Sequence, residues 1–149
     1  LKENEYNPGG STPLYDAIGF GISSIRKEVT DNDSVLVTII TDGEENSSRE
    51  YSGKAIAASI DELKQKGWLF TYIGANQDAV KVAKTMNISN ALNFEQDEEG
   101  TKEMFRRERK SRERFFEKTA SFLGLGKAFA IEARKEIACE DSYFEDTDK

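Results

Sequence analysis

The segment Val35-Leu36-Val37-Thr38-Ile39-Ile40 constrains the fold of this chain more than any other stretch. It is a continuous run of apolar and β-branched residues, which is typical of a strand buried on both faces of a parallel sheet. The run leads directly into a polar loop, Thr41-Asp42-Gly43-Glu44-Glu45-Asn46. Because open α/β sheets place their ligands at the carboxyl ends of their strands, Asp42 is a candidate ligand-binding residue.

Helical and strand patterns alternate around this run. An apolar stripe at spacings of three and four predicts a helix over residues 13–29, with Thr12 as its N-cap and Pro13 at its first position. Similar patterns predict strands over 35–41, 69–74 and 91–94, and helices over 54–66 and 78–86. Strands that alternate with helices imply right-handed crossovers and a parallel sheet. We therefore predict an α/β domain over residues 1–98, with three layers around a doubly wound, Rossmann-like, mainly parallel sheet.

The pattern changes after Glu98, and residues 99–149 are expected to form a C-terminal helical extension. A charge-rich segment predicts a long helix over 101–118, and a second helix is expected over 125–138. The basic residues within 102–118 could contact phosphate or an acidic partner. The interleaved glutamates favour a solvated helix with ion pairs instead. The acidic end, 140–148, is expected to be disordered.

The absence of histidine narrows the chemistry that this 149-residue chain can perform. Ser-His-Asp and Cys-His catalysis are excluded within the chain. A metal site must be built from oxygen ligands, which favours Mg²⁺, Ca²⁺ or Mn²⁺ over Zn²⁺. Cys139 is the single cysteine, so no intramolecular disulfide can form, and we expect a reducing, cytoplasmic location.

The net charge and the hydropathy of the chain limit the classes of partner that it can bind. The formal net charge of −7 argues against binding of nucleic acid or of an anionic membrane by the whole chain. No stretch approaches the roughly 20 apolar residues of a membrane span. We therefore expect neither a nucleic-acid nor a membrane partner.

Two motifs carry a resemblance to a known family. The segments Gly9-Gly10-Ser11-Thr12-Pro13-Leu14-Tyr15-Asp16-Ala17-Ile18-Gly19 and Thr41-Asp42-Gly43-Glu44-Glu45-Asn46 resemble the second and third metal-site segments of the von Willebrand factor A (vWA) domain. Tyr72-Ile73-Gly74-Ala75-Asn76 is similar to the matching strand end of stand-alone bacterial and phage members. The resemblance covers residues 6–96 and implies the C-terminal portion of a vWA fold.

The resemblance implies a metal-ion-dependent adhesion site (MIDAS) for Mg²⁺ or Mn²⁺. Thr12 matches the direct hydroxyl ligand of the second loop, and Asp42 matches the third-loop carboxylate, which commonly acts through water. An acidic residue of a protein partner would complete the coordination. Ser11, Gly43, Glu44 and Asn46 would lie at the rim of this site. The alternative for Glu44, Glu45 and Asn46 is a solvated loop, and Asp16 is expected to serve the start of the helix.

The sequence departs from the family in one respect. The first metal loop, Asp-x-Ser-x-Ser, is absent before Gly9, and we expect it in a half of the fold that lies upstream of Leu1. The strand over 35–41 would pair with the central strand of that half, so it is expected to present an apolar edge here. With Thr12 and Asp42 alone, we expect weak or no Mg²⁺ binding.

The function expected from these residues is protein binding, dependent on a divalent metal in an intact parent, without catalysis. One alternative is a structural fragment that forms homo-oligomers through the exposed strand edge or through helix 102–118. Another is a Mg²⁺-dependent phosphoryl-transfer enzyme in which Asp42 holds the metal. Against this enzyme, the sequence has no Walker-type glycine-rich loop, no general base and no nucleophile with a partner.

Overall fold

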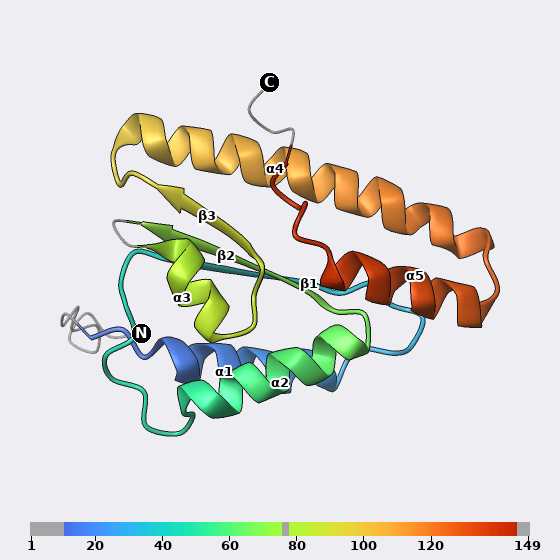
Figure 1. The fold of residues 1–149 in the computed structure, drawn as a ribbon, viewed down its shortest axis with the longest axis horizontal. Helices are drawn as coiled ribbons and strands as arrows, with labels where there is room; N and C mark the ends of the chain where they lie inside the picture. The colour runs from blue at the N-terminus through green and yellow to red at the C-terminus, as the bar shows by residue number, and fades with distance from the viewer. Residues whose placement is uncertain (1–10, 76–77, 146–149) are drawn as a thin grey trace, which may run out of the picture.

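A computed structural model describes residues 11–75 and 78–145 of the chain (Figure 1). In this part, three parallel strands form an open sheet in the order β1-β2-β3, comprising β1 (Leu36–Thr41), β2 (Leu69–Ala75) and β3 (Asn90–Phe94). Leu36 pairs with Leu69, and Thr71 pairs with Asn90. The expected α/β class and the parallel sheet are therefore confirmed.

Helices cover both faces of the sheet (Figure 1). One face packs against α1 (Leu14–Arg26), α2 (Gly53–Gln65) and α3 (Ala79–Thr85). The other face packs against α4 (Glu98–Ala120), the 3-10 turn η1 (Ser121–Gly124) and α5 (Lys127–Cys139). The predicted C-terminal extension thus supplies the second helical layer.

The central strand β2 is buried along its whole length and divides the core in two. Phe70 and Tyr72 face the layer of α1, α2 and α3. Leu69 and Ile73 face α4 and α5. Burying a side chain of this size contributes about 1.5–3 kcal/mol. This alternation explains why nearly all residues of the strand are apolar, with Thr71 as the polar exception, because neither of its faces meets solvent.

The residues at the helix ends show which local signals set where each helix begins and ends. Gly67 adopts φ of +89° directly after Lys66, the C-cap of α2, as its position predicts, and a Cβ there would lie 2.7 Å from the Cβ of Arg134. The predicted N-cap of α1 is wrong, because Pro13 occupies that position and makes no side-chain capping bond. Helix α4 begins earlier than predicted because the Asp97 carboxylate accepts a hydrogen bond from the Gly100 amide at 2.6 Å.

The end of the chain differs from the prediction of disorder over its described part. Tyr143 and Phe144 are buried against the sheet and α4. Asn90 fixes this segment, because its Nδ2 donates to the Glu140 carbonyl at 2.9 Å and its Oδ1 accepts from the Tyr143 amide at 3.1 Å. Arg114 donates to the carbonyls of Tyr143 and Glu145 at 3.0 and 2.6 Å. Two aromatic residues with matched polar anchors therefore order an acidic segment.

The free edge of β1 is the main exposed feature of the sheet. In the described residues, β1 pairs with β2 alone, and the side chain of Ile40 remains 49% exposed. This agrees with the expected exposed edge. Within the same residues, no helix combines the length and the apolar character that crossing a bilayer requires.

Candidate functional site

The candidate site lies at the carboxyl end of β1, where the chain leaves the sheet at Thr41. The Thr41 hydroxyl donates to the Gly43 carbonyl at 2.8 Å and accepts from the Gly43 amide at 3.2 Å. These two bonds fold the chain into a tight turn directly after the strand. Asp42 occupies this turn, and its side chain is exposed.

Thr12 and Asn46 join the two loops that the sequence singled out. The Thr12 amide donates to Asn46 Oδ1 at 2.8 Å, and the Asn46 amide donates to the Thr12 carbonyl at 3.2 Å. The Thr12 carbonyl also accepts from the Leu14 amide at 2.9 Å at the start of α1. Thr12 is therefore held by its backbone, and its side chain is not needed for these bonds.

Gly43 brings the Thr12 hydroxyl next to the Asp42 turn. A Cβ added at Gly43 would lie 2.7 Å from Thr12 Oγ1, a separation that real Cβ atoms do not tolerate. The glycine thus permits a close approach between the two loops. The structure brings Thr12, Gly43 and Asn46 together, and Asp42 is the neighbour of Gly43 in the chain.

The Asp42 carboxylate accepts a hydrogen bond from the loop that follows β3. Its Oδ2 accepts a hydrogen bond from Gln96 Nε2 at 3.2 Å, and Gln96 follows β3. The bond links the carboxyl ends of β1 and β3. Ser11 and Glu44, the other expected rim residues, have exposed side chains.

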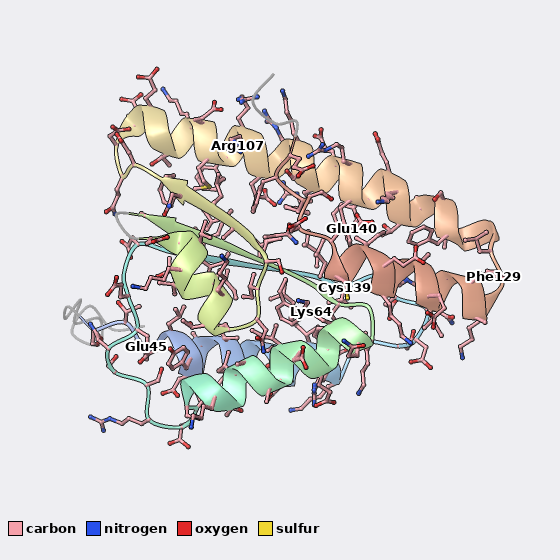
Figure 2. The ribbon with its side chains drawn as sticks, in the orientation of Figure 1. Glu45, Lys64, Arg107, Phe129, Cys139 and Glu140 are labelled. Carbon is pink, nitrogen blue, oxygen red and sulfur yellow. The ribbon has the colours of Figure 1, made fainter. Side chains whose placement is uncertain are left out.

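Glu45 is the residue whose role the sequence did not reveal. It was expected at the rim or in a solvated loop, but its side chain is half-buried at the N-terminus of α1 (Figure 2). Its carboxylate accepts from the amides of Tyr15, Ser47 and Ser48 at 2.8, 2.9 and 2.6 Å, and from the Ser48 hydroxyl at 2.7 Å. Glu45 therefore caps α1 from a separate loop.

The electrostatics of Glu45 follow from these contacts. Burial by itself would raise the pKa of this carboxyl group. The hydrogen bonds from the Ser48 hydroxyl and from the amides of Ser48, Tyr15 and Ser47 outweigh burial and lower the pKa from 4.5 to about 2. Glu45 is consequently a fixed anion that is already fully engaged, and its oxygens are not available to a metal ion.

Asp16 makes the reciprocal connection from α1 to the loop. Its Oδ2 accepts from the Arg49 amide at 2.9 Å, and its Oδ1 accepts from the amides of Glu50 and Tyr51 at 3.0 and 2.9 Å. The bond from Arg49 is the main cause that lowers the pKa of Asp16. The Asp16 amide donates to Ser48 Oγ at 3.0 Å. Asp16 thus serves the helix start, as expected, and also anchors the loop.

Two carboxylates therefore position the candidate site without taking part in it. The signal in the sequence was the proline at the start of α1, because Pro13 offers no capping side chain and another residue has to satisfy the first amides. Glu45, Ser47 and Ser48 lie in the loop that does so.

The candidate site offers oxygen donors of the kind that a hard divalent cation requires. Thr12 and Asp42 offer a hydroxyl and a carboxylate, which are oxygen ligands suited to Mg²⁺ or Mn²⁺. No group of three or more acidic, histidine or cysteine side chains that could hold a metal ion occurs among the residues that the structure describes. The residues present therefore fit the chemistry of such an ion, but they provide few of its ligands.

Comparisons of the chain with protein-family models, with curated proteins and with solved structures found no match. The resemblance to the vWA domain accordingly depends on the sequence motifs alone.

Proposed function

We propose that this chain is part of a protein-binding module of the vWA type. In this module, Thr12 and Asp42 are ligands of a divalent cation, Mg²⁺ or alternatively Mn²⁺ or Ca²⁺. The observation that carries the proposal is the close approach of Thr12 Oγ1 to Gly43, beside Asp42, at the carboxyl end of a parallel strand. The cation would present an open coordination position to an acidic residue of a protein partner.

The free edge of β1 supports the proposal that the chain is part of a vWA-type module. A parallel strand added to this edge would end beside Asp42, because neighbouring parallel strands end at the same side of the sheet. A loop that follows such a strand is the natural place for the Asp-x-Ser-x-Ser ligands. The incomplete ligand set and the strand edge that has no partner strand among the described residues therefore occur at the same element.

The residues have distinct tasks in this proposal. Thr12 supplies a neutral hydroxyl, which leaves the cation electron-poor and favours a carboxylate of the partner. Asp42 supplies charge, directly or through water, and Gln96 orients its carboxylate. Glu45 and Asp16 hold the two loops in place. No catalytic step is assigned to any of them.

The experiment is a titration of the isotope-labelled chain with Mn²⁺, followed by NMR line broadening. We expect millimolar binding, with the amide signals of Thr12, Asp42 and Gly43 broadened first. Asp42→Asn should remove this preference, whereas Asp61→Asn, which changes an exposed carboxylate on α2, should preserve it. Equal broadening over all acidic surfaces would overturn the proposal.

A second candidate function is self-association through the β1 edge, and one specific observation favours it. Ile40 of β1 and Phe105 of α4 are 49% and 53% exposed, and they line a common groove together with Thr38. An unpaired edge next to exposed apolar side chains promotes pairing between chains. Self-association through the β1 edge requires the exposed Ile40 side chain, whereas the proposed cation site does not use it. A substitution of Ile40 therefore separates the two functions.

A further inference from the structure

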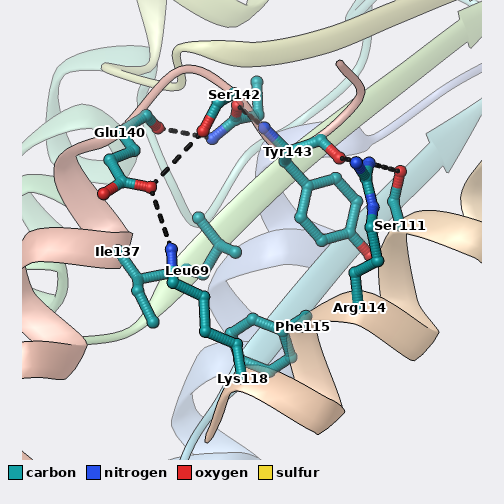
Figure 3. A pocket seen from close by; sticks show the side chains of 10 residues that line it. Leu69, Ser111, Arg114, Phe115, Lys118, Ile137, Glu140, Ser142 and Tyr143 are labelled. Atoms are coloured by element: carbon teal, nitrogen blue, oxygen red, sulfur yellow. Dashed lines mark hydrogen bonds and ion pairs between the residues drawn. The ribbon is translucent and has the colours of Figure 1, made fainter. Parts of the chain in front are cut away.

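We propose that a cavity on the opposite side of the molecule binds a small carboxylate with an aromatic or branched apolar body. The cavity measures about 170 Å³ and lies between α4, α5 and the C-terminal segment (Figure 3). It adjoins Leu69 and Asn90, the first residues of β2 and β3, so it opens at the amino ends of the strands. The proposal is independent of the candidate metal site, which lies at their carboxyl ends.

The inner wall of the cavity is apolar. Leu69, Phe115, Ile137 and the ring of Tyr143 line it, and each is at most 9% exposed. A cavity of roughly 150 Å³ with leucine, isoleucine and phenylalanine walls is large enough for benzene. The cavity as a whole therefore has room for one ring or one branched chain of similar size, and its apolar wall suits such a group.

An exposed ion pair lies at the mouth of the cavity. Lys118 Nζ lies 3.4 Å from Glu140 Oε2 across the opening, and both side chains are about half exposed, at 54% and 48% (Figure 3). An exposed ion pair at this distance contributes little to stability, so Lys118 can turn toward a ligand at low cost.

Arg114, one helical turn before Lys118 on α4, adds a second cation to the lining of the cavity. Its Nη2 donates to the carbonyls of Tyr143 and Glu145 and, at 3.5 Å, to the Ser111 hydroxyl, so that its charge meets neutral oxygens. The lining thus holds two cations and the single carboxylate of Glu140. This balance favours an anionic ligand over a neutral or cationic one.

The wall that closes the cavity is fixed by groups that are not available to a ligand. Both ends of the Asn90 amide are engaged, with the Glu140 carbonyl and the Tyr143 amide. Ser142 Oγ donates to Glu140 Oε2 at 3.4 Å at the same opening, and rotation of this hydroxyl would let it donate to the carboxylate of a ligand instead. The cavity therefore combines a rigid apolar wall with adjustable polar groups at its mouth.

Benzoate, benzamide and benzylamine test the proposal, because they share one ring and differ in charge. The readout is the shift of the methyl NMR signals of Leu69 and Ile137 in the full chain. Benzoate should cause saturable shifts, and the other two compounds should bind at least about tenfold more weakly. Lys118→Met keeps the aliphatic stem, removes the charge and should weaken benzoate about tenfold.

Lys102→Met is the matched control, because Lys102 is an exposed lysine of α4 that pairs with Glu98 outside the cavity. Its affinity for benzoate should equal that of the unmodified chain. The proposal is overturned if the three compounds bind equally, if Lys118→Met binds benzoate unchanged, or if benzoate leaves both methyl signals in place up to its solubility limit.

Discussion

The Glu45 carboxylate accepts a hydrogen bond from the Tyr15 amide at 2.8 Å, across a separation of 30 residues in the sequence. The bond joins the loop after β1 to the first turn of α1, whose own N-cap residue is a proline without a capping side chain. A negative charge at this position also interacts favourably with the helix dipole. Glu45 therefore links the two candidate metal loops, in addition to the bonds between Thr12 and Asn46 and those made by Asp16.

Replacing this side chain should destabilise the whole domain. We expect Glu45→Ala to lower the free energy of unfolding by about 1–3 kcal/mol, because a helix cap and several charge-assisted bonds are lost together. Urea denaturation measures the effect. Glu44→Ala removes the neighbouring exposed carboxylate and should stay within about 0.5 kcal/mol of the unmodified chain. Equal effects of the two variants would contradict the role given to Glu45.

The same carboxylate should make stability depend on pH in acid. The pKa of Glu45 is lowered from 4.5 to about 2 in the folded state, so the unfolded state binds more protons between these values. Its contribution is fully present above pH 4.5 and is lost as the pH falls toward 2. In Glu45→Gln, the loss of stability over this interval should be smaller. Parallel stability curves for the two proteins would show that Glu45 keeps an ordinary pKa.

Gly43 should be required for binding of the cation, whereas the fold should tolerate its substitution. In Gly43→Ala, the new Cβ would lie 2.7 Å from Thr12 Oγ1, so the Thr12 side chain has to rotate. We expect a loss of stability below about 1 kcal/mol, together with loss of the preferred Mn²⁺ broadening at Asp42. Gly21→Ala is the control, because a Cβ there meets nothing within 4 Å, and it should stabilise α1 by up to about 1 kcal/mol.

The β1 edge should control association. Ile40→Lys places a charge on the exposed edge, which opposes strand pairing between chains. Light scattering at high protein concentration should show a lower mean mass than for the unmodified chain. Val80→Lys changes another exposed apolar residue, on α3, and should have no such effect. If both variants associate like the unmodified chain, self-association through β1 is excluded.

Hydrophobic period and glycine position predicted the elements of the fold because both are local properties. The residues of 69–74 indicated a strand, which the structure extends by one residue to Ala75, and the position of Gly67 indicated the end of α2. The order of the C-terminal segment could not be predicted in this way. Its average composition is acidic, and the buried anchors of Tyr143, such as Asn90, lie far away in the sequence.

The candidate site was predictable only in its outline. Thr12 and Asp42 followed from their motifs, and the structure brings their loops together at Gly43. The partner of Asp42, Gln96, is 54 residues away, and a chain without a disulfide or internal repeat offers no sequence signal for such a contact. Glu45 was missed because a carboxylate in a polar loop has the same appearance in a sequence whether it is solvated or engaged.

The claim that Thr12 and Asp42 share one cation is tested most directly by the affinity for Mn²⁺ in Thr12→Val, Asp42→Asn and the double variant. Electron paramagnetic resonance of free Mn²⁺ measures this affinity. If both residues bind one ion, each single change should weaken binding by about tenfold, and the double change should add little, because contacting sites are not additive. Fully additive losses, or single variants with unchanged affinity, would contradict the shared site.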